Sequence, residues 1–219
     1  MPIVLDDLKL SYTPVPKTAC TSLKMVFFDI ENGREFVPFR HNGREFHIHK
    51  VYASVLFNPK QAGRLADYRR LILVRDPIQR LLSAYGNRVV HHRELSLANA
   101  RKELFAHDLA PDPGLEEFVT KLPRYMKAVE SIDHHARPLV DFAGTDAAYY
   151  TRVYRMSEIE DMVADLSAVA GRRLTVGRLQ TGGPKLSVDD LGRREIDTLR
   201  QFYAEDYRAF GRYFEGAQG

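Results

Sequence analysis

Residues 15–24 read Val-Pro-Lys-Thr-Ala-Cys-Thr-Ser-Leu-Lys, and this stretch decides the fold that we expect for the 219-residue chain. It follows an apolar-alternating segment, residues 8–12, and runs into apolar residues at helical spacing from Leu23 to Ile30. These patterns predict a strand, a tight loop and a helix, with Ser22 as the helix N-cap. A helix N-terminus beside lysines and hydroxyls is suited to binding an anion. We therefore predict a phosphate-binding loop, with a capped helix carrying exposed lysines as the alternative.

The composition of this loop narrows the class of ligand. A Walker A loop requires two glycines and Gly-Lys-Ser/Thr at fixed spacing, whereas residues 15–24 contain no glycine. An ordinary nucleoside triphosphatase is therefore not expected. Cys20 is the single cysteine of the chain, which rules out an internal disulfide and fits a reducing compartment. Because no histidine stands beside it in the sequence, we interpret Cys20 as structural rather than as a nucleophile.

The whole chain has the size and composition of one globular domain, residues 1–219. Hydrophobic residues make up 44% of it, and no repeat or low-complexity linker interrupts it. A net charge of +3 is too small to indicate a nucleic acid as partner. No apolar run approaches the roughly 20 residues of a membrane span, and the first residues do not resemble a signal peptide. We expect a soluble, cytoplasmic protein.

Strand-like and helix-like segments alternate along the chain. The predicted strands cover residues 35–39, 46–52, 70–75 and 152–156. The predicted helices cover 59–66, 77–89, 115–131 with a kink at Pro123, 158–170, and 191–213 as one helix or a pair. This alternation predicts an α/β fold with a central, mostly parallel sheet flanked by helices. Ligands of such folds bind beyond the carboxyl ends of the strands, where both the first loop and Arg75 fall.

A second segment, residues 75–85, reads Arg-Asp-Pro-Ile-Gln-Arg-Leu-Leu-Ser-Ala-Tyr. Arg75 ends a predicted buried strand, and Asp76 with Pro77 forms a helix start. Ser83 lies two turns into that helix. An arginine fork with a nearby hydroxyl suits a terminal phosphate. The alternative is a salt bridge between Arg75 and Asp76, with Ser83 as a small packing residue.

The two segments together resemble the sulfotransferases, which use PAPS (3′-phosphoadenosine 5′-phosphosulfate) as donor. The resemblance rests on residues 12–24 and 70–88, and its finer likeness is to the heparan sulfate 2-O-sulfotransferase type. It implies a single P-loop-like domain and an enzyme that needs no metal. It also implies that residues 15–24 bind the 5′-phosphosulfate and that Arg75 and Ser83 bind the 3′-phosphate.

The resemblance implies a role for each residue of the donor site. Lys17 would stabilise the charge that develops on the leaving phosphate. The donor phosphate would be held by the backbone N–H groups and hydroxyls of Thr18, Ala19, Cys20, Thr21, Ser22 and Leu23. The segment 180–185, Gln-Thr-Gly-Gly-Pro-Lys, falls where the family often has a basic loop over PAPS. Lys185 would then contact the donor; the alternative is a surface turn.

Sulfuryl transfer to a hydroxyl needs a base, and histidine has the appropriate pKa near neutral pH. His47 and His49 alternate on a strand-like segment and are expected to share one face. The resemblance implies His49 as the base and His47 as a positioning group or second base. A surface strand or a metal site remain alternatives, although no third metal ligand is evident. His134-His135, in an expected loop, could line an acceptor cleft, and His91-His92 ends a helix.

The leading hypothesis is a PAPS-dependent sulfotransferase that acts on a hydroxyl, with a glycan or glycolipid as the expected acceptor. A small-molecule alcohol or phenol is the alternative acceptor. A nucleotide kinase-like phosphotransferase would need magnesium ligands and a glycine loop, which the sequence does not offer. A non-catalytic binder of phosphorylated or sulfated ligands is the remaining alternative. Intact Lys17, Arg75 and Ser83 argue against a degenerate site.

Overall fold

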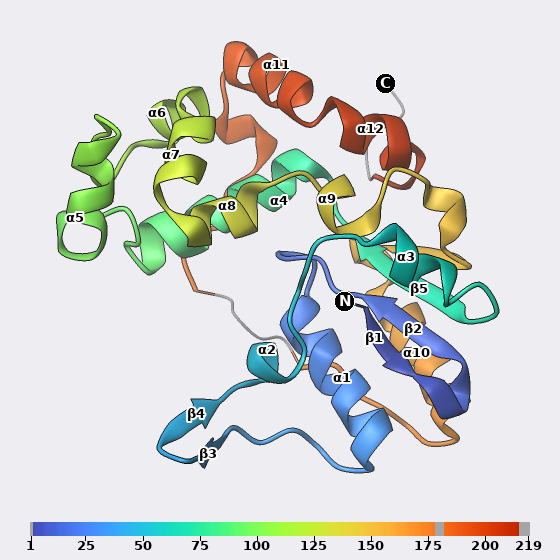
Figure 1. Ribbon diagram of the computed structural model, residues 1–219. Helices are drawn as coiled ribbons and strands as arrows, with labels where there is room; N and C mark the ends of the chain where they lie inside the picture. Colours follow the sequence, from blue (N-terminus) through green and yellow to red (C-terminus); the bar gives the residue numbers. More distant parts are fainter. Residues whose placement is uncertain (1, 178–181, 215–219) are drawn as a thin grey trace. The chain divides into compact units, whose positions relative to one another are not determined.

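The computed structural model describes residues 2–177 and 182–214, and these form two compact units (Figure 1). The first unit comprises residues 1–75, 139–180 and 212–219, and the second comprises 76–138 and 181–211. Each unit has its own apolar core. The organisation of residues 1–219 as a single domain stays a prediction.

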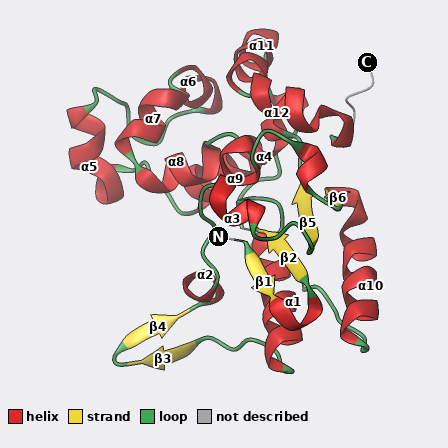
Figure 2. Cartoon of the chain, turned by 45° about the vertical axis from the view of Figure 1, so that its right-hand side comes forward, coloured by secondary structure: helices red, strands yellow, loops and turns green. Residues whose placement is uncertain are grey.

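The first unit contains a four-stranded sheet in the order β1 (Ile3–Leu5), β2 (Leu10–Thr13), β5 (Arg69–Val74) and β6 (Arg152–Arg155). The strands β2, β5 and β6 are parallel, and only β1 pairs antiparallel. Figure 2 shows this sheet in yellow with helices beside it. The predicted α/β fold with a mostly parallel sheet is confirmed. The first predicted strand begins later than expected, because residues 6–8 form a 3₁₀ turn.

Two helices cover one face of this sheet, α1 (Cys20–Asn32) and α10 (Ile159–Ala170). Alternate strand residues point into the shared core, including Tyr12 on β2 and Tyr154 on β6. Tyr12 stacks on Phe27 of α1 with ring centroids 4.9 Å apart. The helix α1 ends at Gly33, whose φ of 66° closes the last turn. The packing of α1 on the sheet therefore fixes where its N-terminus lies.

A hairpin and short helical turns follow α1 in the same unit. The strands β3 (Phe39–His41) and β4 (Arg44–Phe46) are joined by Asn42-Gly43, both with positive φ. The turns α2 (Ile48–Val51), α3 (Pro59–Gly63) and α9 (Val140–Ala143) are each one turn long. The predicted strands at 35–39 and 46–52 are wrong. Pro38 offers no backbone donor, and buried Ile48 anchors a helical turn where the second strand was expected.

The second unit is helical and contains the second motif. It comprises α4 (Pro77–Ala84), a π-helical segment (Tyr85–His91), α5 (Leu97–Ala106), α6 (Leu115–Thr120), α7 (Leu122–Ala128), α8 (Glu130–Ala136), α11 (Arg193–Phe202) and α12 (Ala204–Phe210). Asp76 caps α4 as predicted, since its carboxylate accepts from the Gln79 N–H at 3.0 Å. The predicted kinked helix over 115–131 is broken at Lys121, before Pro123, and again at Val129.

The remaining helical turns are short 3₁₀ segments at Ala147–Tyr149, Met156–Glu158, Val188–Asp190 and Gly211–Tyr213. The predicted strand at 152–156 and the helix at 158–170 are confirmed by β6 and α10. The closing helix pair is confirmed by α11 and α12. Among the described residues, no helix combines the length and apolar character needed to cross a membrane.

Candidate functional site

The predicted anion-binding stretch, residues 15–24, begins in the loop of residues 14–19 between β2 and α1 and continues into α1. It turns sharply without glycine, because Lys17 (φ 66°) and Ala19 (φ 53°) adopt left-handed backbone conformations. Ala19 is the residue before α1, so the helix begins at Cys20. The first N–H groups of a helix have no intrahelical acceptor. The loop therefore directs backbone donors and a positive helix end toward one place, as an anion site requires.

The hydroxyls of this loop already have protein partners. Thr18 donates to the Val15 carbonyl oxygen at 2.9 Å and is fully buried, which closes the loop on itself. Ser22 donates to the Gly177 carbonyl oxygen at 2.6 Å. Ser22 is thus the third residue of α1, and its prediction as the N-cap is wrong because the chain already turns at Ala19. The Leu23 N–H donates to the Ala19 carbonyl oxygen, and the Leu23 side chain lies in the core.

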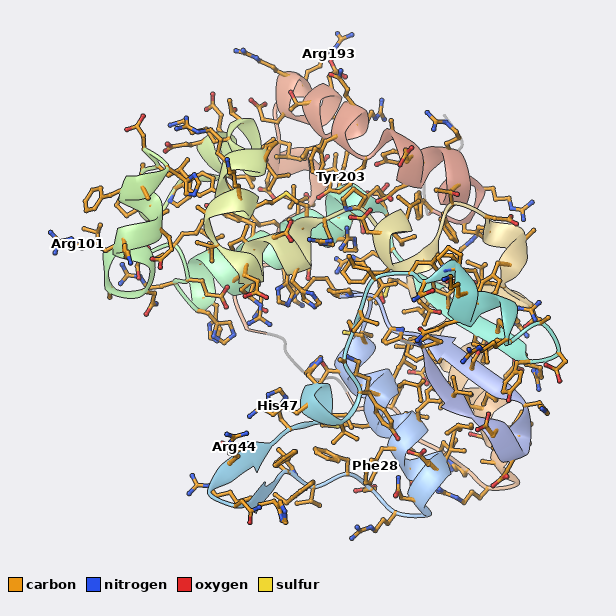
Figure 3. All side chains as sticks on the ribbon, viewed as in Figure 1. Phe28, Arg44, His47, Arg101, Arg193 and Tyr203 are labelled. Carbon is orange, nitrogen blue, oxygen red and sulfur yellow. The ribbon has the colours of Figure 1, made fainter. Side chains whose placement is uncertain are left out.

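His49 lies against the N-terminal end of α1. Its Nε2 is 2.8 Å from Thr21 Oγ1, and its Nδ1 is 3.1 Å from Lys24 Nζ. His47 precedes α2 and is labelled in Figure 3. His49 lies in the helical turn α2 and His47 is the residue before it, so the predicted strand that would carry both on one face is wrong. Their rings nevertheless lie 5.9 Å apart.

Lys24 is a residue of this site to which the sequence analysis gave no role. Its side chain is fully buried, and Nζ also donates to Ser54 Oγ at 2.9 Å. Burial lowers the pKa of Lys24, while the nearby Cys20 thiol opposes that shift. The sequence signal that could have predicted its burial was spacing. Lys24 stands one residue after Leu23 and three before Phe27, on the buried face of α1.

Arg75 follows β5 directly and is half-buried. Because β5 runs parallel to β2, with Thr13 opposite Ile72, Arg75 and the anion loop leave the sheet at the same edge. The Asp76 carboxylate accepts from the Gln79 N–H and, at 2.9 Å, from the Tyr207 hydroxyl. Both oxygens of Asp76 are therefore engaged by groups other than Arg75.

The other predicted donor-binding residues, Ser83 and Lys185, belong to the second unit. Ser83 is half-buried on α4, and Lys185 is exposed. The glycines before Lys185 pack on the π-helical segment, and a Cβ at Gly183 (φ 97°) would collide with the Gly86 carbonyl oxygen. Gln180 and Thr181, which begin this predicted basic loop, lie outside the described residues.

The second arginine of the motif, Arg80, is fully buried inside the second unit. Its guanidinium donates to the carbonyl oxygens of His135, at 3.2 Å, and Arg137. These carbonyls belong to the end of α8, where helix acceptors have no intrahelical donor. Arg80 therefore holds α8 against α4, and it is a structural residue.

The remaining histidines differ partly from expectation. His134 and His135 lie within α8 rather than in a loop, because α8 extends to Ala136. The His135 Nδ1 is 2.7 Å from the Ser131 carbonyl oxygen, one turn earlier. His91 ends the π-helical segment, as predicted. Within residues 2–177 and 182–214, no group of three or more histidine, cysteine, aspartate or glutamate side chains is placed to hold a metal ion.

The chain is similar to known proteins over a range that includes both motifs. A model of the sulfotransferase family matches residues 2–213. Carbohydrate sulfotransferase 11 of Mus musculus is 25% identical over 187 residues, which cover 77% of this chain and 53% of that protein. Carbohydrate sulfotransferase 11 of Danio rerio is 33% identical over 89 residues, covering 39% of this chain and 25% of that protein.

The chain thus spans about half the length, or less, of these curated relatives. No solved structure matches it. The likeness to the heparan sulfate 2-O-sulfotransferase type stays a prediction, since these relatives carry a different name. Because the family model covers nearly the whole sequence, from the first strand to the last helical turn, the chain belongs to the sulfotransferase family.

Proposed function

We propose that this protein transfers the sulfuryl group of PAPS to a hydroxyl of a carbohydrate, with His49 as the general base. The observation that carries the proposal is the contact of His49 Nε2 with Thr21 at the start of α1. This contact supports the proposal, because a candidate base then lies next to the loop that has the backbone geometry of an anion site. Membership of the sulfotransferase family supports PAPS as the donor.

The reaction needs three contributions from this chain. The backbone N–H groups at the start of α1 hold the phosphate of the donor. The Lys17 ammonium stabilises the negative charge that develops on the phosphate oxygen as its bond to sulfur breaks. His49 takes the hydroxyl proton of the acceptor as the new oxygen–sulfur bond forms. Arg75, at the same sheet edge as the loop, is proposed for the 3′-phosphate; the roles of Ser83 and Lys185 stay predictions.

The acceptor class is the finer part of the proposal. The named relatives are carbohydrate sulfotransferases, and this supports a carbohydrate hydroxyl. The heparan sulfate 2-O type of acceptor and the cytoplasmic location stay predictions from the sequence.

Two measurements test this function. Calorimetry with adenosine 3′,5′-bisphosphate should show saturable binding, and labelled PAPS should transfer sulfate to members of a glycan panel. His49→Ala should lower turnover by about 10²- to 10⁴-fold without a matching loss of nucleotide affinity, whereas His41→Ala, in the exposed hairpin, should not. Absence of nucleotide binding would contradict the proposal, and transfer to phenols alone would replace the carbohydrate acceptor.

A further inference from the structure

The hydrogen bonds of Lys24 restrict the proton positions on His49. The two contacts described for Lys24 Nζ, with His49 Nδ1 and Ser54 Oγ, are both to neutral groups. A lysine ammonium carries three donors and no acceptor, whereas a neutral amine carries a lone pair. A charged Lys24 therefore forces Nδ1 of His49 to accept, and only a neutral Lys24 allows Nδ1 to donate.

The charged state of Lys24 leaves one arrangement, and the neutral state adds a second. When Lys24 is charged, His49 Nδ1 accepts from Nζ, so the proton of the neutral ring sits on Nε2 and points at Thr21 Oγ1. When Lys24 is neutral, its lone pair can accept from the Nδ1–H of His49, and Nε2 then keeps its own lone pair. Only the second arrangement gives His49 a basic nitrogen on the side of the anion loop.

We propose that Lys24 and His49 form one proton-accepting pair, in which the charge on Lys24 selects the ring nitrogen of His49 that carries the proton. The next step rests on the proposed function. During sulfuryl transfer, the acceptor hydroxyl proton passes to Nε2 of His49 while the Nδ1 proton passes to Lys24 Nζ. The acceptor oxygen–sulfur bond forms and the sulfur–phosphate oxygen bond breaks. One proton enters the pair, which ends with charged Lys24 and the Nε2–H form of His49.

Burial favours this use of Lys24. Its side chain is fully buried, and desolvation lowers its pKa, so the neutral amine forms at a lower pH than in an exposed lysine. Titratable groups near the pair include, among the described residues, the Cys20 thiol, one turn earlier on α1, and the His47 ring, 5.9 Å from His49. Lys24 acts through His49 and is therefore a positioning residue.

Nuclear magnetic resonance of ¹⁵N-histidine in the full chain tests the pairing without any donor or acceptor. Two-bond ¹H–¹⁵N correlations report the tautomer, and His49→Gln assigns the signal. We expect His49 to change from the Nε2–H to the Nδ1–H form as pH rises through the titration of Lys24. The change should persist in Cys20→Ala and disappear in Lys24→Met. A single tautomer throughout in the wild type, or a change retained in Lys24→Met, would overturn the pairing.

Kinetics give a second, separable readout. The wild-type kcat should rise with pH over the same range as the tautomer change. In Lys24→Met this rise should be absent, and kcat should be at least about tenfold lower than in the wild type. The KM for PAPS should be unchanged. If Lys24→Met lost kcat and donor affinity equally, Lys24 would be a structural residue and the proposed pairing would be wrong. If Lys24→Met does not fold, the wild-type tautomer titration alone decides the outcome. Absence of transfer would refute the proposed function but leave the resonance test standing.

Discussion

Arg75 and Arg80 stand five residues apart in one motif, yet we expect different roles for them, and replacing each by methionine should separate these roles. Arg80 is fully buried and donates to two carbonyl oxygens at the end of α8. Arg75 is half-buried at the sheet edge where the anion loop begins. Methionine keeps much of the side-chain length but removes every donor.

The expected destabilisation by Arg80→Met follows from the two carbonyl oxygens that lose their donor. A buried acceptor that loses its partner costs about 1–3 kcal/mol. The two acceptors left here are partly buried, so we expect a loss in the lower half of the combined range, about 3 kcal/mol in the free energy of unfolding. For a chain of this size that corresponds to a fall of about 6–12 °C in Tm. The guanidinium also lies over the Tyr203 ring, 5.9 Å from its centroid, which adds to the loss.

Arg75→Met should instead act on the ligand. Losing a charge-assisted hydrogen bond to a phosphate costs about 1.5–3 kcal/mol, or roughly 10- to 150-fold in Kd. Urea denaturation and calorimetry with adenosine 3′,5′-bisphosphate measure the two quantities on the same variants. The reasoning is refuted if Arg80→Met leaves stability within about 0.5 kcal/mol of the wild type, or if Arg75→Met destabilises the fold as much as Arg80→Met.

Three further predictions concern the loop, the glycine segment and the buried lysine. Lys17→Ala should lower turnover by about 10²- to 10³-fold with little change in Tm, and full activity in a transfer assay would remove Lys17 from the mechanism. Gly183→Ala should lower Tm clearly more than Gly177→Ala, because only the first Cβ meets a backbone oxygen, and equal melting curves would contradict the packing. The lowered pKa of Lys24 means that the unfolded chain binds more protons between that pKa and 10.5. The stability of the wild type relative to Lys24→Met should therefore rise with pH across this window in urea denaturation, and a constant difference would show that the pKa of Lys24 is not lowered.

The parts of the fold that sequence reasoning predicts correctly are those with local signals. The buried apolar residues of β5 are bounded by charged residues. Asp76 is the N-cap of α4, and Pro77 is its first residue. The strand, loop and helix around residues 10–32 likewise follow from hydrophobic period alone. In each case the residues that determine the element lie within it.

The errors occur where distant residues decide the conformation. The alternation of residues 46–52 is typical of a strand, but Ile48 is buried and His49 contacts α1, some 25 residues earlier. Ser22 has the hydroxyl of a typical N-cap, yet the left-handed turn at Ala19 makes the helix begin earlier, at Cys20. Asn42-Gly43 is a hairpin turn signal that the strand predictions at 35–39 and 46–52 did not use. Lys24 is hidden by its type, since lysine is expected at the surface and its buried partners come from residues 49 and 54.

The glycine-free loop has a thermodynamic consequence for ligand binding. Glycine has more conformational freedom in the unfolded chain than any other residue, and a glycine-rich cradle that is mobile before binding has to lose that freedom when the ligand arrives. Lys17 and Ala19 instead hold left-handed backbone conformations that L-residues rarely adopt, at about 1–2 kcal/mol each. That cost is incurred when the chain folds, together with the hydrogen bond that closes the loop at Thr18. An anion therefore meets a cradle that is already ordered, and its affinity carries little penalty for freezing the backbone.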